Sequence, residues 1–176
     1  MGPTIRDLKE ICGGSFDLIT TLNIGTDLID NIQILHNLGY YHRDLKPNNI
    51  AFGALGKGSL KFRLNIGILD FGNAKAIANV KNNSRAKHFN NYGNRIYSSD
   101  NVLKGGEFKK MDDIISIFYI LIEAFTGSLP WKIKTKETQI NNSEAILKIR
   151  QLYPPAKLCE KFPKKFIDIF SYILSE

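Results

Sequence analysis

Apolar side chains follow a helical spacing in two long parts of the chain. Residues 16–37 carry apolar side chains close to one helical stripe, and Gly39 follows where such a helix would end. Residues 112–125 start with two aspartates, continue as an almost wholly apolar stretch, and precede Gly127 and Pro130. Aspartates favour the start of a helix, whereas glycine and proline favour its end. The pattern therefore predicts two long helices, the second of them buried.

Two further helices are expected near the end of the chain. Asn142 or Ser143 can cap a short helix that runs to about Leu152, before two prolines. Pro163 can open the last helix, because proline is tolerated in the first turn. Its apolar positions are Phe166, Ile169, Phe170 and Ile173.

The middle of the chain has a different pattern. Residues 49–52 and 62–69 are rich in strand-forming side chains, and a glycine-rich turn at residues 53–58 separates them. This pattern predicts a β-hairpin. Residues 73–106 are rich in Asn, Gly, Ser and Lys, with few apolar positions. Such a long irregular stretch usually indicates a functional loop in a compact domain.

Composition limits the class of protein. A chain of 176 residues with 43% hydrophobic and 23% charged residues is long and apolar enough for one folded domain, which excludes intrinsic disorder. Cys12 and Cys159 are far apart and lack the spacing of a zinc site, so both are expected to be thiols in a reducing compartment. No membrane span is expected, because the apolar run at residues 114–125 is too short and contains Glu123.

The formal net charge is +7, which favours an anionic partner such as a nucleotide, a nucleic acid or an acidic peptide. Nucleic acid is the weakest of these alternatives, since the basic residues are scattered along the chain. The expected location is intracellular, in the cytoplasm, with a cytoskeletal assembly or the nucleus as alternatives.

Candidate chemistry is concentrated in two short segments. Residues 42–49 read HRDLKPNN, and a tight loop there would bring the side chains of Asp44, Lys46 and Asn49 to one point. Asp70 begins the tripeptide DFG, whose glycine, Gly72, permits a turn that directs the carboxylate toward the same point. Oxygen atoms of Asn49 and Asp70 suit Mg²⁺, a hard cation that also binds phosphates. This layout is suited to phosphoryl transfer.

These two segments resemble the catalytic-loop and Asp-Phe-Gly motifs of the protein kinases. The subfamily that the chain resembles is the casein kinase I group with its vaccinia-related and tau-tubulin relatives. The further segments that carry this resemblance are GPTIRDL at residues 2–8, the hairpin at residues 53–69, GNRIYSS at residues 93–99 and GSLPW at residues 127–131. The resemblance implies an α+β fold: the mainly α-helical C-terminal lobe of a kinase, with a small β-hairpin.

The resemblance also implies roles for single residues. Asp44 would accept or orient the hydroxyl of the Ser or Thr to be phosphorylated, and Lys46 would neutralise charge on the transferred phosphoryl group. Asn49 and Asp70 would hold Mg²⁺ with ATP. Structural roles are expected for His42, Arg43, Phe71, Gly72 and Asp113, the last of which would hold the catalytic-loop backbone or simply favour the start of its helix.

Two further sets of residues could contact ligands. Asp7 matches a position near the nucleotide ribose in the family, although an exposed aspartate at a helix start is an equal alternative. Acidic or phosphorylated substrates would bind to a rim of basic side chains. The alternative is that these side chains are only solvated surface residues with no binding role. The rim consists of Arg95, Lys132, Lys134 and Lys136.

Departures from the family pattern raise a second hypothesis. Residue 1 falls at the hinge of the family domain, and Glu176 comes before its last helices, so residues 1–176 are expected to be a C-lobe without an N-lobe. Asn94 also replaces a threonine that bonds near the catalytic aspartate and lysine in the family. The chain is then either part of an active Ser/Thr kinase that uses Mg²⁺ and ATP, or a non-catalytic, kinase-derived component of a larger assembly that binds neither. In either case the isolated chain is expected to be inactive.

Other protein chains are the expected partners, because two surfaces that a complete kinase covers would be open here. They could be covered by the missing lobe or by a larger assembly. One surface lies around Tyr40, Ile50, Ile68 and Phe71. The other is the outer side of the last helix.

Overall fold

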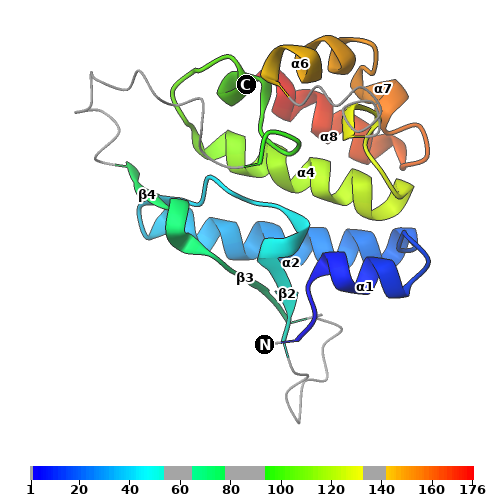
Figure 1. Cartoon of the computed structure of the whole chain (residues 1–176), viewed down its shortest axis with the longest axis horizontal. Helices are drawn as coiled ribbons and strands as arrows, with labels where there is room; N and C mark the ends of the chain where they lie inside the picture. Colours follow the sequence, from blue (N-terminus) through cyan, green and yellow to red (C-terminus); the bar gives the residue numbers. More distant parts are fainter. Residues whose placement is uncertain (1, 54–64, 78–93, 133–141) are drawn as a thin grey trace.

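The computed structural model describes residues 2–53, 65–77, 94–132 and 142–176. Figure 1 shows a mainly helical molecule with two short pairs of strands. The helices are α1 (Ile5–Ile11), α2 (Leu18–Asn37), α3 (Asp100–Leu103), α4 (Lys110–Thr126), α6 (Ser143–Gln151), α7 (Pro155–Leu158) and α8 (Lys164–Ser175). The strands are β1 (Tyr40–Tyr41), β2 (Ile50–Phe52), β3 (Ile66–Ile68) and β4 (Lys75–Ala76), and short 3₁₀ turns span η1 (Pro47–Asn49) and η2 (Phe71–Asn73).

Helix α4 is the centre of the core. It packs against α2 on one side and against α8 on the other, as Figure 1 shows. Twelve of its 17 residues are buried, which explains why its sequence is apolar on nearly every face. The ring of Phe118 stacks on that of Phe170 with centroids 5.1 Å apart, and Trp131 is fully buried next to Tyr119.

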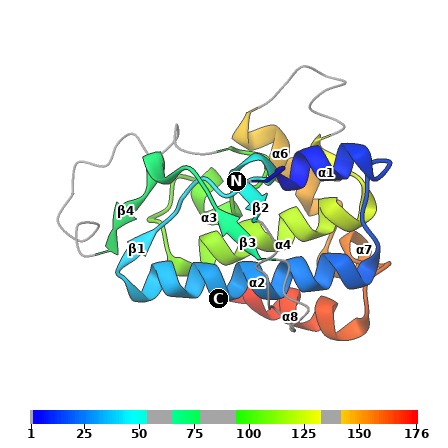
Figure 2. The same cartoon turned by 90° about the horizontal axis from the view of Figure 1, so that it is seen from below.

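Both strand pairs are antiparallel and lie beside α2 (Figure 2). In the first pair Ile50 is opposite Ile68, and in the second Tyr40 is opposite Ala76. The side-chain amide of Asn31 on α2 donates a 2.6 Å hydrogen bond to the Ile66 carbonyl, which fastens β3 to the helix. The two pairs thus hold the 42–49 segment and the residues after β3 on the same side of the core.

The expected helices are confirmed, with small shifts at their ends. The first begins at Leu18 because the Asp17 carboxylate caps it, accepting a 2.9 Å hydrogen bond from the Thr20 N–H. The apolar helix extends to Lys110–Thr126. Asn142 caps α6 through its side-chain oxygen, and Pro163 immediately precedes α8.

The hairpin is confirmed by the β2–β3 pairing, although most of its turn, residues 54–64, lies outside the described residues. The expectation of irregular chain over residues 73–106 was wrong in two places, because β4 and α3 lie within that range. Elements α7 and β1 were not predicted, and α1 was expected only through the alternative that Asp7 lies at a helix start. Each is too short to show a periodic pattern, and a capping box between Thr4 and Asp7 starts α1.

The two surfaces expected to be open are only partly so. Tyr40 and Phe71 are 46% and 51% exposed, but Ile50 is fully buried, since β2 packs onto the core, and the prediction for it was wrong. On α8, Phe166, Phe170 and Ile173 face the core, whereas Ile169 and its neighbours Tyr172 and Leu174 are exposed. Cys12 is exposed, Cys159 is buried, and both are free thiols. In the part of the chain that is described, no helix has the length and apolar character needed to cross a membrane.

Candidate functional site

Asp113, near the start of α4, fixes the beginning of the 42–49 segment. Its carboxylate is 1% exposed and accepts hydrogen bonds from the backbone N–H groups of His42 and Arg43, at 2.9 and 3.0 Å. The same carboxylate lies 2.9 Å from Nε2 of His36, at the end of α2. Arg43 has a φ of 69°, a strained value for a residue other than glycine, and the Asp113 contact helps to hold it there.

Asp44 is the centre of the site. Its side chain is nearly buried, and Oδ2 accepts a 2.6 Å hydrogen bond from Nζ of Lys46. Oδ1 accepts a 3.1 Å hydrogen bond from the backbone N–H of Asn94. The amide of Asn49 donates to the Asp44 carbonyl oxygen at 2.9 Å. A carboxylate, an ammonium group and an amide are therefore brought together at one point.

His42 is fully buried, and both its ring nitrogens have partners. Nδ1 is 3.3 Å from the Asp44 N–H, which can only donate, so Nε2 carries the proton and donates to the Leu69 carbonyl at 3.0 Å. The ring also meets that of Phe71 edge to face, with centroids 5.3 Å apart. His42 thus links the 42–49 segment to the residues that follow β3.

Asp70 has a left-handed conformation, with φ 60° and ψ 75°, and is exposed. Its Oδ1 accepts a 3.2 Å hydrogen bond from the Gly72 N–H, which forms the η2 turn. The Leu69 N–H donates to the Asn49 carbonyl at 2.8 Å, so the β2–β3 pairing places Asp70 next to Asn49. Asn49 directly precedes β2 and Asp70 comes two residues after β3, so both lie at the same end of the strand pair.

The oxygen atoms of Asn49 and Asp70 fit a magnesium ion by their chemistry. Because the Asn49 amide nitrogen is bound to Asp44, its Oδ1 is left as an acceptor, and no described residue donates to it. The exposed carboxylate of Asp70 offers a second oxygen donor. Mg²⁺ is commonly held by one or two protein oxygens together with phosphates and water. Asn49 and Asp70 could therefore hold Mg²⁺ with a nucleotide.

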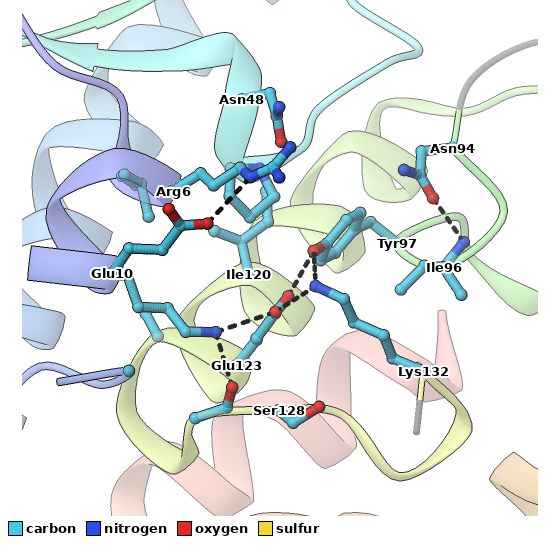
Figure 3. Close-up of a pocket in the computed structure, with 16 residues that line it drawn as sticks. Arg6, Glu10, Asn48, Asn94, Ile96, Tyr97, Ile120, Glu123, Ser128 and Lys132 are labelled. Carbon is cyan, nitrogen blue, oxygen red and sulfur yellow. Dashed lines mark hydrogen bonds and ion pairs between the residues drawn. The ribbon is translucent and has the colours of Figure 1, made fainter. Parts of the chain in front are cut away.

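A pocket of about 500 Å³ lies beside this site, between α1, the end of α4 and the 94–97 turn. Figure 3 shows Asn48 and Asn94 at its upper edge and Glu123 toward its lower side. Arg6 and Glu10 on α1 form an exposed ion pair at the left of the pocket in Figure 3. Asp44, Lys46, Asn49 and Asp70 do not line the pocket, which meets the site through Pro47, Asn48 and Asn94. Its lining includes both acidic and basic side chains.

Glu123 is almost completely buried although it belongs to the apolar helix α4. It binds Lys9 from α1, Lys132 from beyond α4, and the hydroxyl of Tyr97. Burial acts to raise the pKa of Glu123, but the hydrogen bonds from Lys132, Tyr97 and Lys9 outweigh it, so that its pKa lies below its usual value. For Tyr97, burial and the adjacent Glu123 charge raise the pKa far above its usual value.

The remaining predicted residues have varied surroundings. The Asp7 carboxylate caps α1, accepting hydrogen bonds from the Thr4 N–H and hydroxyl at 2.9 and 2.8 Å. Hydrogen bonds from Thr4 lower the pKa of Asp7. Arg95 is half-buried in the 94–98 turn. The Lys132 ammonium binds Glu123, so much of its charge is offset inside the fold, while Lys134 and Lys136 lie outside the described residues.

Several residues of the site were not found by sequence reasoning. Lys9, Tyr97 and His36 are brought in from distant segments, and no local pattern marks them. Glu123 did carry a signal, because a lone carboxylate in an apolar helix needs partners when it is buried. Its lysine partners could not have been named from spacing, since they are 114 and 9 residues away.

Comparison with protein families agrees with this geometry. The family model of the protein kinase domain matches residues 5–176, which is nearly the whole chain and includes the 42–49 segment, Asp70 and Asp113. The mainly helical α+β fold expected from the sequence is therefore confirmed. The chain belongs to the protein kinase domain family.

Proposed function

We propose that the chain is the C-lobe of a Ser/Thr protein kinase of the casein kinase I type, and that it acts inside the cell. The observation that carries the proposal is the Asp44 carboxylate, held by Lys46 and by the Asn94 N–H beside an open pocket. In this reading Asp44 accepts the proton of the acceptor hydroxyl. The acceptor oxygen bonds to the γ-phosphorus of ATP as the bond from that phosphorus to the ADP oxygen breaks.

In this proposal Lys46, which binds Asp44, neutralises charge on the transferred phosphoryl group, and the oxygens of Asn49 and Asp70 bind a magnesium ion. Magnesium, when bound with ATP, supplies charge neutralisation of the phosphates. An N-lobe with a glycine-rich loop would have to cover the nucleotide. This N-lobe would belong to the same polypeptide or to another one. The exposure of Tyr40 and Phe71 supports such a covering partner, since Tyr40 comes two residues before His42 and Phe71 directly follows Asp70.

Acidic or already phosphorylated proteins are the proposed substrates. Lys9 and Lys132 both bind the single carboxylate of Glu123, so this side of the pocket keeps a net positive charge of one. Arg95 lies in the adjoining turn. Positive charge near the acceptor site favours peptides with acidic or phosphorylated flanks. A peptide library phosphorylated equally with acidic and basic flanks would contradict this choice.

The test uses the chain purified with its natural partners through a tag at its C-terminus. Transfer of labelled phosphate from Mg-ATP to casein or an acidic peptide is expected, and Asp44→Asn should lower its rate by about three orders of magnitude or more. The matched control is Asp168→Asn, an exposed position on α8. Transfer that is the same for Asp44→Asn and the unmodified protein comes from a contaminating kinase and would overturn the proposal.

A second candidate function is that of a non-catalytic component of a larger protein assembly, which would bind no nucleotide. The exposure of Ile169 and Tyr172 on one side of α8 favours it, because contiguous apolar surface usually marks an interaction site. Purified assembly that contains the chain but shows no Asp44-dependent transfer and no nucleotide binding would support this alternative.

A further inference from the structure

Asn94 begins a tight turn that is closed by hydrogen bonds within the turn. Its side-chain Oδ1 accepts a 3.0 Å hydrogen bond from the Ile96 N–H, visible in Figure 3. Its carbonyl accepts hydrogen bonds from the N–H groups of Tyr97 and Ser98, at 3.0 and 3.3 Å. An asparagine that bonds the backbone two residues ahead fixes the chain direction at the start of a turn.

The far side of this turn is bound to the core. The Ile96 carbonyl accepts hydrogen bonds from Nε1 of Trp131, at 2.8 Å, and from Arg150, at 3.0 Å. Arg150 also donates to the Ser98 carbonyl at 2.7 Å. Trp131 and Arg150 are themselves buried and lie on separate parts of the chain. The turn is therefore held to the core at Ile96 and Ser98, while its Asn94 end is held by the Asn94 side chain and Asp44.

The only part of Asn94 that reaches Asp44 is its backbone. The Asn94 N–H donates to Oδ1 of Asp44 at 3.1 Å, while Lys46 binds Oδ2. Within the described residues, the Asn94 side chain bonds Ile96 and not Asp44. Hydrogen bonds to a carboxylate are among the stronger ones, so this N–H helps to set the orientation of the Asp44 side chain.

We propose that Asn94 is a positioning residue for phosphoryl transfer, in which the side-chain oxygen closes the turn that directs its own N–H at the Asp44 carboxylate. The inference rests on the proposed function of Asp44. It differs from what the family resemblance implies at this position, namely a threonine whose side chain itself bonds near the catalytic residues. Here the Asn94 side chain bonds the Ile96 N–H and closes the turn, and the backbone N–H of Asn94 binds Asp44.

A direct role is the rival explanation. Asn94 is exposed and lines the pocket beside Asp44, so its amide nitrogen could instead bind the acceptor peptide. The two explanations differ in what a serine at this position would do. A serine hydroxyl can close the turn as an asparagine oxygen does, more weakly, but it cannot reach as far into the pocket.

The kinetic test compares Asn94→Ala with Asn94→Ser in the chain purified with its natural partners, using Mg-ATP and an acidic acceptor peptide. Alanine removes the bond to the Ile96 N–H and loosens the turn. If the N–H of residue 94 then no longer binds the Asp44 carboxylate, kcat should fall roughly 10- to 100-fold, with both KM values changed less than about threefold. Serine should recover most of kcat. Equal loss for both variants, or a rise in the acceptor KM alone, would overturn the inference.

A second measurement does not need activity. In the chain purified with its natural partners, the backbone amide of residue 94 should exchange slowly with solvent. The Asn94→Ala variant should exchange it at least about tenfold faster, while Asn94→Ser stays slow. Asp44→Ala should also speed the exchange. If residue 94 exchanges alike in all four proteins, Asn94 does not position Asp44. If exchange follows the expected order but no transfer is found, the proposed function fails and the positioning of Asp44 stands.

Discussion

Lys9 and Glu123 form an ion pair that joins α1 to the last turns of α4 across 114 residues of sequence. The Lys9 ammonium is 3.0 Å from Oε1 of Glu123 and 2.7 Å from the Gly127 carbonyl that follows the helix. Its side chain is 15% exposed and that of Glu123 is 3% exposed. With Lys132 and Tyr97 also bound to Glu123, one carboxylate holds three segments together beside the candidate site.

We expect Glu123→Gln to destabilise the protein by about 2 kcal/mol at pH 7, since charged hydrogen bonds are lost. The pKa of Glu123 is lower in the folded state than its ordinary value of 4.5. Its stabilising effect is therefore present above about pH 4.5 and is lost as the pH falls through the folded-state pKa. Urea unfolding at pH 3 to 7 should show that the free energy of unfolding falls more steeply with decreasing pH for the unmodified chain than for the variant.

The matched control for Glu123 is Glu10→Gln on α1, where the carboxylate is exposed and pairs with Arg6 at 3.4 Å. This change should alter stability by less than about 0.5 kcal/mol. If the free energy of unfolding falls equally with decreasing pH for Glu123→Gln and the unmodified protein, Glu123 is not the carboxylate that causes the loss of stability in acid.

Asp113→Ala should destabilise the fold by about 3 kcal/mol. The substitution leaves the buried N–H of His42 and the partly buried N–H of Arg43 without acceptors, and an unpaired group away from water carries a desolvation cost. Denaturant unfolding measures the loss, with Asp168→Ala on the exposed side of α8 as the control. A loss no larger than that of the control would contradict the anchoring role of Asp113.

The isolated 176-residue chain should not phosphorylate protein. Phosphoryl transfer depends on positioning ATP against Asp44. If the chain is a C-lobe, as proposed above, it lacks the cradle for the β- and γ-phosphates. We expect a rate several powers of ten below that of the complete enzyme. The assay is transfer of labelled phosphate to casein or an acidic peptide. Transfer by the isolated chain that Asp44→Asn abolishes would refute the prediction.

Any binding of Mg-nucleotide to the isolated chain should pass through Asp70 and Asn49. A few oxygen ligands and one lysine on an open surface suggest a dissociation constant no better than millimolar, or about −4 kcal/mol. Asp70→Ala should abolish the rise in melting temperature caused by Mg-ATP, and Asp168→Ala should leave it unchanged. Survival of the rise in Asp70→Ala would show that these ligands are wrongly assigned.

The isolated chain should associate through its exposed apolar side chains. Ile169 and Tyr172 on α8 are 54% and 63% exposed, and Ile19 and Ile34 on α2 are 74% and 59% exposed. Covering even about 400 Å² of apolar surface would contribute roughly 10 kcal/mol. Sedimentation should show oligomers or aggregates at micromolar concentration, reduced when Ile169 and Tyr172 are replaced by serine. A soluble, cooperatively melting monomer of the unmodified chain would contradict this.

The sequence alone determined the features that depend on neighbouring residues. The helices α2, α4, α6 and α8 follow from apolar periodicity and from end signals such as Asn142 and Pro163, because both depend on residues within a few positions. The grouping of Asp44, Lys46 and Asn49 follows for the same reason, since six residues and one proline leave few arrangements. The β2–β3 pairing then carries Asp70 to the same place as Asn49.

The tertiary structure alone decided which distant side chains complete the site. Asn94 meets Asp44 across 50 residues, His36 meets Asp113 across 77, and Lys9 meets Glu123 across 114. Short elements such as α1 and β4 were also settled by packing, because two to seven residues carry too little pattern. Burial of a carboxylate demands partners but does not name them. Which side chains bind the buried carboxylate depends on how the helices pack around α4, and no local pattern in the sequence encodes this packing.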